Sequence, residues 1–209
     1  MKRKTKIWGL IAIILLAGVW YLMGDNTSGV YNRIMGGDKK EELQIPQDFV
    51  SGDPNAPVTM IEYVSHFCGY CALFHKNTLP LIIDNYIKPG KVKLVQVFIS
   101  GMDIGQAILC AKEQRSDTMM ELNEYLIENI KDVSKNNLNT IVERFGINGT
   151  EFDKCFGENK YAEKVKEWHE LSREVGVTGT PTFFIGDKII EGNQPYSVFK
   201  EVFDEALGE

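Results

Sequence analysis

Two cysteines and two histidines stand close together in the stretch SHFCGYCALFH, residues 65–75. Cys68 and Cys71 are separated by two residues, and His66 and His75 flank them. Thiolate and imidazole groups are the usual ligands of zinc, so the cluster could be a metal site. The cysteines could instead form a structural disulfide, or a disulfide that opens and closes in a reaction. The surrounding sequence has to decide between these three interpretations.

A helix that begins at the first cysteine would favour disulfide exchange. A thiolate attacks disulfides and a thiol does not, so a redox cysteine must ionise easily at neutral pH. At the first turn of a helix, Cys68 would meet unpaired backbone N–H groups and the positive end of the helix dipole. The spacing places Cys71 on the same helix face, close enough to form a bridge. The pattern predicts Cys68 as the nucleophile and Cys71 as its resolving partner.

The other two interpretations explain the motif less well. A closed zinc site would need further ligands, but the sequence has no second CxxC and no HxxxH. A disulfide between residues three apart closes a very small loop and constrains the unfolded chain little. We therefore expect a redox function without a bound metal or cofactor. His66 and His75 are then either surface residues or side chains that tune Cys68.

The elements that must position the motif follow from the spacing of apolar residues. The segments 57–64 and 91–100 predict buried strands, and a helix is expected from Cys68 to about residue 85, kinked at Pro80. Helical patterns follow, one of them after a capping box of Thr118 and Glu121. Residues 180–192 predict a hairpin and residues 195–207 a last helix. The order β-α-β, a helical block, then α-β-β-α indicates an α/β fold with a helical insertion.

Glu62 is an unusual residue for the first predicted strand. The strand is apolar on both of its faces, at Met60, Ile61, Tyr63 and Val64. This pattern is typical of a strand that is buried on both sides. A buried carboxylate is costly unless it titrates, so Glu62 is a candidate for proton transfer. The alternative is an ordinary strand residue that faces solvent.

The N-terminus predicts export from the cytoplasm. Four basic residues in MKRKTK precede an uncharged apolar run, residues 7–23. A helix of this length spans about 25 Å, at the short end for a bilayer. Residues 1–24 are therefore a membrane anchor or a signal peptide, and the bulky Trp20, Tyr21 and Leu22 favour the anchor. Either one sends the polar tether 25–47 and the rest of the chain outward, where disulfides persist.

The charge of the exported part excludes a nucleic-acid-binding role. The basic head takes four of the 23 basic side chains, which leaves 19 against 29 acidic ones and a net charge of −10 for residues 25–209. Such a domain has no electrostatic footprint for nucleic acid. The acidity is better explained by solubility.

The two segments IEYVSHFCGYCALFHKNTLP and GVTGTPTFFIGDKIIEG resemble the DsbA-like branch of the thioredoxin superfamily. The resemblance covers residues 48–209. It implies a thioredoxin fold with a helical domain, about residues 102–164, inserted between the second strand and a cis-proline loop. It also implies a cis Thr180–Pro181 bond next to the active-site disulfide, and it assigns Glu62 to the family's buried acid.

The resemblance further implies a protein disulfide oxidoreductase. We expect it to introduce disulfides into reduced exported proteins in the bacterial periplasm or cell envelope, with a membrane redox partner that resets its cysteines. Disulfide isomerisation is the alternative, and a non-catalytic binding or chaperone module is an alternative of another class. The absence of heptads before the domain favours a monomer. The expected substrate surface consists of residues 66–70 and 179–182, with contacts from Thr180, His66, Phe67, Gly69 and Tyr70.

Cys110 and Cys155 lie at opposite ends of the predicted insertion. They could be buried free thiols, which is the common state of an isolated cysteine in a helix. Free thiols would, however, be exposed to the domain's own redox centre, and an even number of cysteines allows them to pair. Relatives of this branch look to carry a disulfide at equivalent places, so the resemblance implies a bridge here as well. We therefore predict a structural Cys110–Cys155 disulfide.

Overall fold

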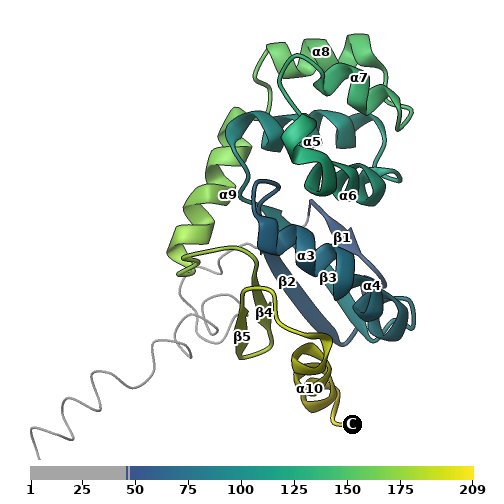
Figure 1. The fold of residues 1–209 in the computed structure, drawn as a ribbon, viewed down its shortest axis with the longest axis vertical. Coiled ribbons are helices and arrows are strands. Elements are labelled where there is room, and N and C mark those ends of the chain that lie inside the picture. Colours follow the sequence, from purple (N-terminus) through teal and green to yellow (C-terminus); the bar gives the residue numbers. More distant parts are fainter. Residues whose placement is uncertain (1–45, 47) are drawn as a thin grey trace, which may run out of the picture. The chain divides into compact units, whose positions relative to one another are not determined.

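The computed structural model describes residue 46 and residues 48–209 of the chain (Figure 1). The expected N-terminal membrane segment, residues 1–24, and the tether, residues 25–47 apart from residue 46, lie outside the described residues. None of the helices in the described part is both long enough and apolar enough to span a membrane.

A mixed sheet lies at the centre of the fold (Figure 1). Its strands, in the described part of the chain, are β1 (Val50–Ser51), β2 (Val58–Val64), β3 (Val92–Phe98), β4 (Thr182–Ile185) and β5 (Lys188–Glu191). Their order in the sheet is β1-β3-β2-β4-β5, and only β2 and β3 are parallel. Strand β2 is paired on both edges, and all of its residues except Thr59 are buried, which agrees with its apolar residues of both parities. The sequence pattern does not predict β1, because two residues cannot show an alternation.

Helices cover one face of this sheet and carry the cysteine motif. They are α3 (Gly69–Asn77), α4 (Leu79–Ile82), the π-helix η1 (Ile83–Ile87) and α10 (Tyr196–Leu207). The single helix expected from Cys68 to about residue 85 is thus divided at Thr78. Proline lacks an N–H and cannot continue the hydrogen bonds of a preceding helix. Pro80 accordingly stands in the first turn of α4, where no such bond is needed.

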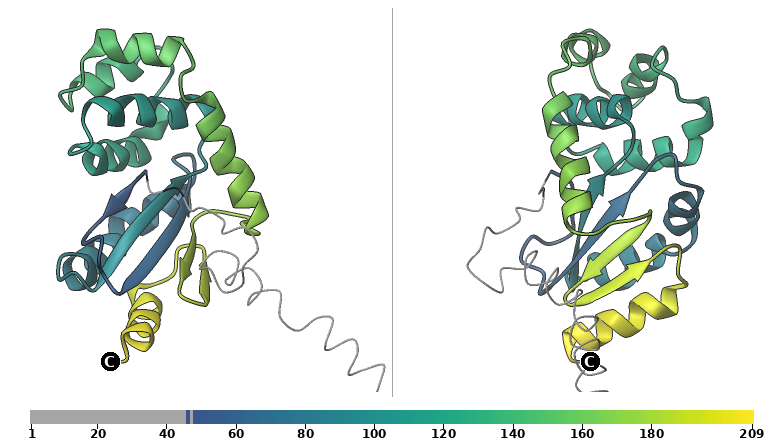
Figure 2. Two further views of the ribbon diagram at one scale, coloured as in Figure 1. Left: turned by 180° about the vertical axis from the view of Figure 1, so that it is seen from behind. Right: turned by 90° about the vertical axis from the view of Figure 1, so that its left-hand side faces the viewer.

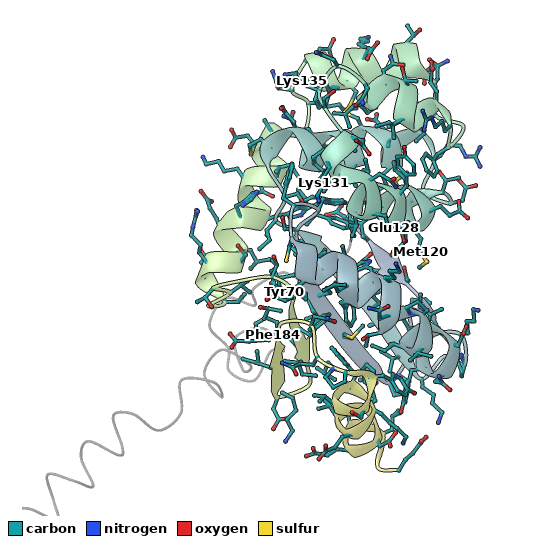
Figure 3. All side chains as sticks on the ribbon, in the orientation of Figure 1. Tyr70, Met120, Glu128, Lys131, Lys135 and Phe184 are labelled. Carbon is teal, nitrogen blue, oxygen red and sulfur yellow. A yellow bond between two sulfur atoms is a disulfide. The ribbon has the colours of Figure 1, made fainter. Side chains whose placement is uncertain are left out.

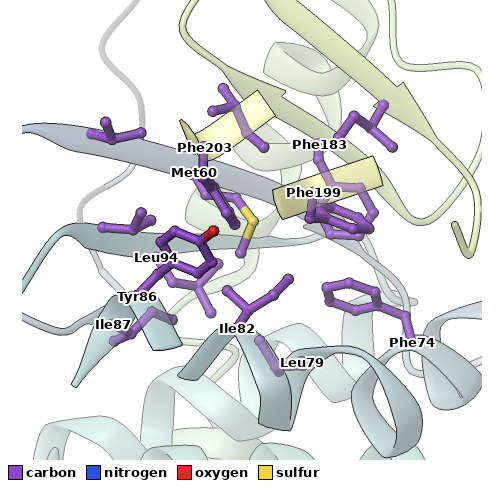
Figure 4. Packing of buried hydrophobic residues seen from close by; sticks show 14 residues of the cluster. Met60, Phe74, Leu79, Ile82, Tyr86, Ile87, Leu94, Phe183, Phe199 and Phe203 are labelled. Atoms are coloured by element: carbon purple, nitrogen blue, oxygen red, sulfur yellow. The ribbon is translucent and has the colours of Figure 1, made fainter. Parts of the chain in front are cut away.

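The hydrophobic core between the sheet and these helices holds α3 in place (Figure 4). Phe74 of α3 is fully buried, and its ring centroid lies 4.5 Å from that of Phe183 in β4 and 5.3 Å from that of Phe199 in α10. Burying a phenylalanine side chain contributes about 1.5–3 kcal/mol. The aromatic cluster therefore fixes the helix immediately behind Cys71.

The helical insertion forms a separate layer at one end of the sheet (Figures 1 and 2). Its helices are α5 (Met102–Gln114), α6 (Met119–Asn129), the 3₁₀-helix η2 (Ile130–Asp132), α7 (Leu138–Glu143) and α8 (Gly149–Gly157). Helix α9 (Ala162–Glu174) then leads back from the insertion to β4. This confirms the predicted thioredoxin fold with a helical domain between the second predicted strand and the proline loop.

A disulfide and a close helix contact stabilise the insertion. Cys110 of α5 and Cys155 of α8 form a disulfide with Cα atoms 5.8 Å apart, so they are not free thiols in this structure. Helix α5 approaches α9 closely at Gly105, where a Cβ atom would lie only 2.7 Å from a methyl group of Val165.

The predicted capping box of α6 is wrong. Thr118 precedes the helix, but its hydroxyl makes no capping bond. Its backbone lacks the extended conformation that would aim the side chain at the first N–H groups of the helix.

Candidate active site

Cys68 is the N-cap residue of α3, as the motif predicts. Its side chain is half-buried and receives a hydrogen bond from the Cys71 backbone N–H at 3.4 Å. Partial burial raises the pKa of Cys68, but hydrogen bonding by the Thr180 side chain and by Cys71 outweighs it, and the pKa lies below its ordinary value. The helix terminus thus favours the thiolate form of an accessible sulfur.

Cys71 has the opposite environment. It is a thiol with no solvent exposure, one turn into the same helix. Burial raises the pKa of Cys71 far above that of a free thiol, and the nearby charge of Glu62 raises it further. The two cysteines therefore differ in access and acidity: Cys68 is partly exposed and has a lowered pKa, whereas Cys71 is buried and has a raised one.

The loop before β4 completes the site beside Cys68. The Thr180–Pro181 peptide bond is cis, and the Cys68 thiol donates a hydrogen bond to the Thr180 carbonyl oxygen at 3.0 Å. The antiparallel pairing of β4 with β2, in which Thr182 lies opposite Tyr63, brings the loop to the end of β2 that leads into α3. A hydrogen bond from the Gly192 N–H to the Pro181 carbonyl, 2.8 Å long, holds the other side of the loop.

Glu62 is fully buried in β2, which excludes a solvent-facing role. One carboxylate oxygen lies 2.8 Å from His75 Nε2, and the other accepts a hydrogen bond from the Gln96 side chain at 2.9 Å. His75 is also buried, and its Nδ1 lies 2.8 Å from the carboxylate of Glu124. Burial lowers the pKa of His75, but the charge of Glu62 and the hydrogen bonds that the ring donates to Glu124 and Glu62 outweigh it and raise the pKa to about 10. The interpretation of His75 as a surface residue is therefore wrong.

His66 was expected on the substrate surface, and this expectation is wrong. The side chain is buried, with its ring 5.2 Å from that of Phe98. Its backbone N–H donates to Ser100 Oγ at 2.9 Å, and Nδ1 lies 2.6 Å from the same oxygen. Burial lowers the pKa of His66 to about 3, so the ring is neutral. Ser100, two residues after the end of β3, thus contacts both the backbone N–H and the Nδ1 of the inward-facing His66.

The remaining residues expected at the substrate surface are accessible. Phe67 and Tyr70 expose 62% and 65% of their surface on either side of Cys68, and Gly69 between them is exposed as well. Tyr70 lies at the end of α3 that is nearest the proline loop (Figure 3). Thr180 is half-buried. Together they border the Cys68 sulfur with apolar surface and with backbone groups.

Two residues of the site carry no signal in the sequence. Gln96 and Glu124 complete the surroundings of Glu62 and His75, yet Glu124 is 49 residues away from His75 in the chain. Neither lies in a recognisable motif. Within the described residues, no group of three or more histidine, cysteine or acidic side chains is arranged to hold a metal ion.

Comparison with known proteins agrees with this geometry. A family model described as thioredoxin matches residues 44–205. Disulfide bond formation protein D of Bacillus subtilis is 25% identical over 169 residues, which cover 76% of each chain. A Rickettsia conorii protein named "putative protein-disulfide oxidoreductase" is 29% identical over 171 residues, which cover 78% of this chain and 61% of that one.

A solved structure supports the fold. The crystal structure of oxidised BdbD from Bacillus subtilis superimposes with a TM-score of 0.71 at 22% identity, over 77% of this chain and 92% of that one. A family match of this extent, a cis-proline loop beside a CxxC helix and relatives named for disulfide chemistry lead to one assignment. The chain belongs to the thioredoxin family and is a DsbA-like protein disulfide oxidoreductase.

Proposed function

We propose that this protein introduces disulfides into exported proteins by exchange through Cys68 and Cys71. It works outside the cytoplasm, in the bacterial periplasm or cell envelope, and residues 7–23 anchor it in the membrane. The name of the Bacillus subtilis relative, which refers to disulfide bond formation, supports the direction of the reaction. The apolar run and the basic head of the sequence support the location.

The contrast between the two cysteines is the observation that carries the proposal. The half-exposed Cys68 has a lowered pKa, and the buried Cys71 has a raised one. A stabilised Cys68 thiolate favours the dithiol form of the enzyme, because a low thiol pKa makes that sulfur a good leaving group. An enzyme whose dithiol form is stabilised gives its disulfide to substrates readily.

The reaction follows from this asymmetry. A substrate thiolate attacks Cys68 Sγ, the Cys68–Cys71 bond breaks, and Cys71 takes the electron pair and a proton. A second substrate thiolate attacks the substrate sulfur of the mixed disulfide and releases Cys68 as a thiolate. The substrate has lost two electrons and the enzyme has gained them. A membrane redox partner with a disulfide of its own then accepts these electrons and restores the Cys68–Cys71 bond.

The substrate lies along Thr180, Phe67, Gly69 and Tyr70. An extended chain placed beside the proline loop would pair with the backbone of Thr180, while Phe67 and Tyr70 offer apolar contact that does not depend on a particular sequence. Backbone pairing suits reduced and unfolded proteins, because they expose their main chain but share no particular side-chain sequence. Glu62 serves as the proton acceptor for Cys71 in the later step, when the Cys68–Cys71 bond is restored. The enzyme acts as a monomer.

The test is to measure two reactions and a reduction potential on the same protein. We expect residues 48–209 to oxidise a reduced unfolded protein faster than they reshuffle a scrambled one, with a strongly oxidising Cys68–Cys71 couple. Faster reshuffling would identify an isomerase. A protein that binds unfolded chains without changing their thiols would be a chaperone module.

A further inference from the structure

His75 lies between two carboxylates that come from different parts of the fold. Its Nε2 is 2.8 Å from Glu62 in β2, and its Nδ1 is 2.8 Å from Glu124 in α6. The side chains of His75 and Glu62 are fully buried, whereas 32% of the Glu124 side chain is exposed. Carboxylate oxygens accept hydrogen bonds, so both ring nitrogens of His75 must donate. This arrangement selects the positively charged imidazolium.

Cys71 lies on the same side of α3 as His75, one helical turn before it. Residues four apart in a helix have Cβ atoms about 5–6 Å apart. Both side chains are buried toward the sheet, where Glu62 contacts His75. The buried Cys71 thus lies near the Glu62–His75 pair, and the charge of Glu62 raises the pKa of Cys71.

Disulfide exchange places negative charge on Cys71 whenever the Cys68–Cys71 bond forms or breaks. A charge in the protein interior is costly unless an opposite charge lies near it. Glu62 alone would raise the cost of a negative charge on Cys71, because like charges repel strongly in a medium of low dielectric constant. The imidazolium of His75 makes the Glu62–His75 pair neutral and removes that repulsion.

We propose that His75 and Glu124 are positioning residues for the reaction of Cys71. Glu124 keeps His75 charged and oriented, and the charge of His75 offsets that of Glu62 while Cys71 carries negative charge. Neither residue touches the reacting sulfurs. The inference rests on the exchange through Cys68 and Cys71 proposed above, and it makes the helical insertion, which supplies Glu124, a part of the redox centre.

The groups around His75 are consistent with this role. The buried polar groups near the pair include Gln96, which donates to Glu62, and His66, which is neutral. On the outer side, a groove of about 380 Å³ between α6 and the α3–α4–η1 segment borders His75. The charged residues that line this groove are Lys76, Asp84, Lys88, Glu124 and Glu128. Figure 3 shows Met120 and Glu128 on the side of α6 that faces this segment.

Glu124→Gln tests the proposal without removing a buried side chain. The amide oxygen still accepts a hydrogen bond from His75 Nδ1, but the negative charge is gone. The dithiol protein is mixed with excess dithiobis(nitrobenzoate) in a stopped-flow instrument. The first release of coloured thiolate reports the attack of Cys68 on the reagent. The second, which does not depend on reagent concentration, reports the attack of Cys71 on the mixed disulfide.

We expect Glu124→Gln to slow the second phase by roughly tenfold, the effect of one unit in the pKa of Cys71, and to leave the first nearly unchanged. The difference in second-phase rate between the wild type and Glu124→Gln should grow as the pH rises. Wild-type His75 stays charged to about pH 10, whereas in the variant the pKa of His75 falls toward neutrality and the charge is lost earlier. A purely structural defect would slow the second phase by a factor that does not vary with pH. Glu124→Asp should restore most of the rate.

Glu128→Gln is the matched control. Glu128 lies one turn further along α6, lines the same groove and is exposed. The Glu128→Gln variant should have the same rates as the wild type in both phases. Thermal melting compares the stability of all variants. A second phase that is unchanged in Glu124→Gln, or slowed equally by Glu128→Gln, overturns the inference. A wild-type protein that shows both phases but does not oxidise unfolded substrates overturns the proposed function instead.

Discussion

The Cys68 sulfur lies 3.0 Å from the carbonyl oxygen of Thr180, a residue 112 positions later in the chain. This contact joins the start of α3 to the cis-proline loop. In the proposed reaction, the sulfur that forms the mixed disulfide and the backbone that pairs with the substrate chain are therefore neighbours.

The two cysteines should have separable roles. Cys68→Ser should abolish the oxidation of a reduced unfolded protein, because no other accessible sulfur is available in the site. Cys71→Ala should retain the attack on substrate but accumulate mixed disulfides, which non-reducing electrophoresis and mass spectrometry detect. Full activity of Cys68→Ser would rule out the mechanism.

Alkylation should show the difference in acidity between the cysteines. Since the pKa of Cys68 is lowered, the reaction of the dithiol protein with iodoacetamide should reach half of its maximum rate at a pH below that of a free thiol. Cys71 should remain unmodified over this range, because burial raises its pKa. Peptide mapping of the label assigns each site. A Cys68 that titrates like an ordinary thiol would contradict the N-cap argument.

His66 should make the protein sensitive to acid. In the folded state burial lowers its pKa to about 3, whereas an unfolded histidine titrates near 6.5. The unfolded chain therefore binds a proton that the folded chain does not, and stability present above pH 6.5 is lost as the pH falls toward 3. The loss amounts to about 1.4 kcal/mol per pH unit.

Comparison with His66→Gln isolates this effect. The variant lacks the titrating group, so the difference in unfolding free energy between wild type and variant should shift by about 2 kcal/mol between pH 6.5 and pH 5, to the disadvantage of the wild type. Urea unfolding at both pH values measures it. A difference that does not change with pH would show that His66 can be protonated in the folded protein.

Gly105→Ala should destabilise the contact between α5 and α9. The added methyl group would meet Val165 at 2.7 Å, and overpacking of this kind costs about 1–3 kcal/mol. The double variant Gly105→Ala with Val165→Ala should recover part of the loss. Gly157→Ala is the control, because a Cβ atom there has no neighbour within 4 Å. Thermal unfolding compares the variants, and equal stability of both alanine variants would contradict the close packing.

The Cys110–Cys155 bridge should contribute to stability but not to exchange. It closes a loop with a sequence separation of 45, for which the chain-entropy argument gives roughly 4 kcal/mol as an upper value. The double variant Cys110→Ala with Cys155→Ala should unfold at lower urea concentration and still oxidise substrates at the temperature where it is folded. A loss of activity in the folded variant would assign the bridge a part in catalysis.

Features with local signals could be predicted from the sequence. The CxxC motif after a buried strand, the threonine and proline before β4 and the apolar spacing of the helices gave the architecture, because each follows from a few neighbouring residues. The inward turn of His66 depends on Ser100, and the charge of His75 depends on Glu124; both partners are distant in the chain. Such contacts exist only after the insertion has packed on α3, so no local pattern reports them.

The position of Glu124 limits how this protein can be recombined with its relatives. Its carboxylate belongs to α6 of the insertion, while the imidazole that it contacts belongs to α3. A chimera whose insertion comes from an oxidoreductase without an acid at this position would leave His75 with one carboxylate instead of two, even where the new boundaries join without a clash. The two parts of the fold are therefore not interchangeable modules, and a designed exchange has to carry α3 and α6 together.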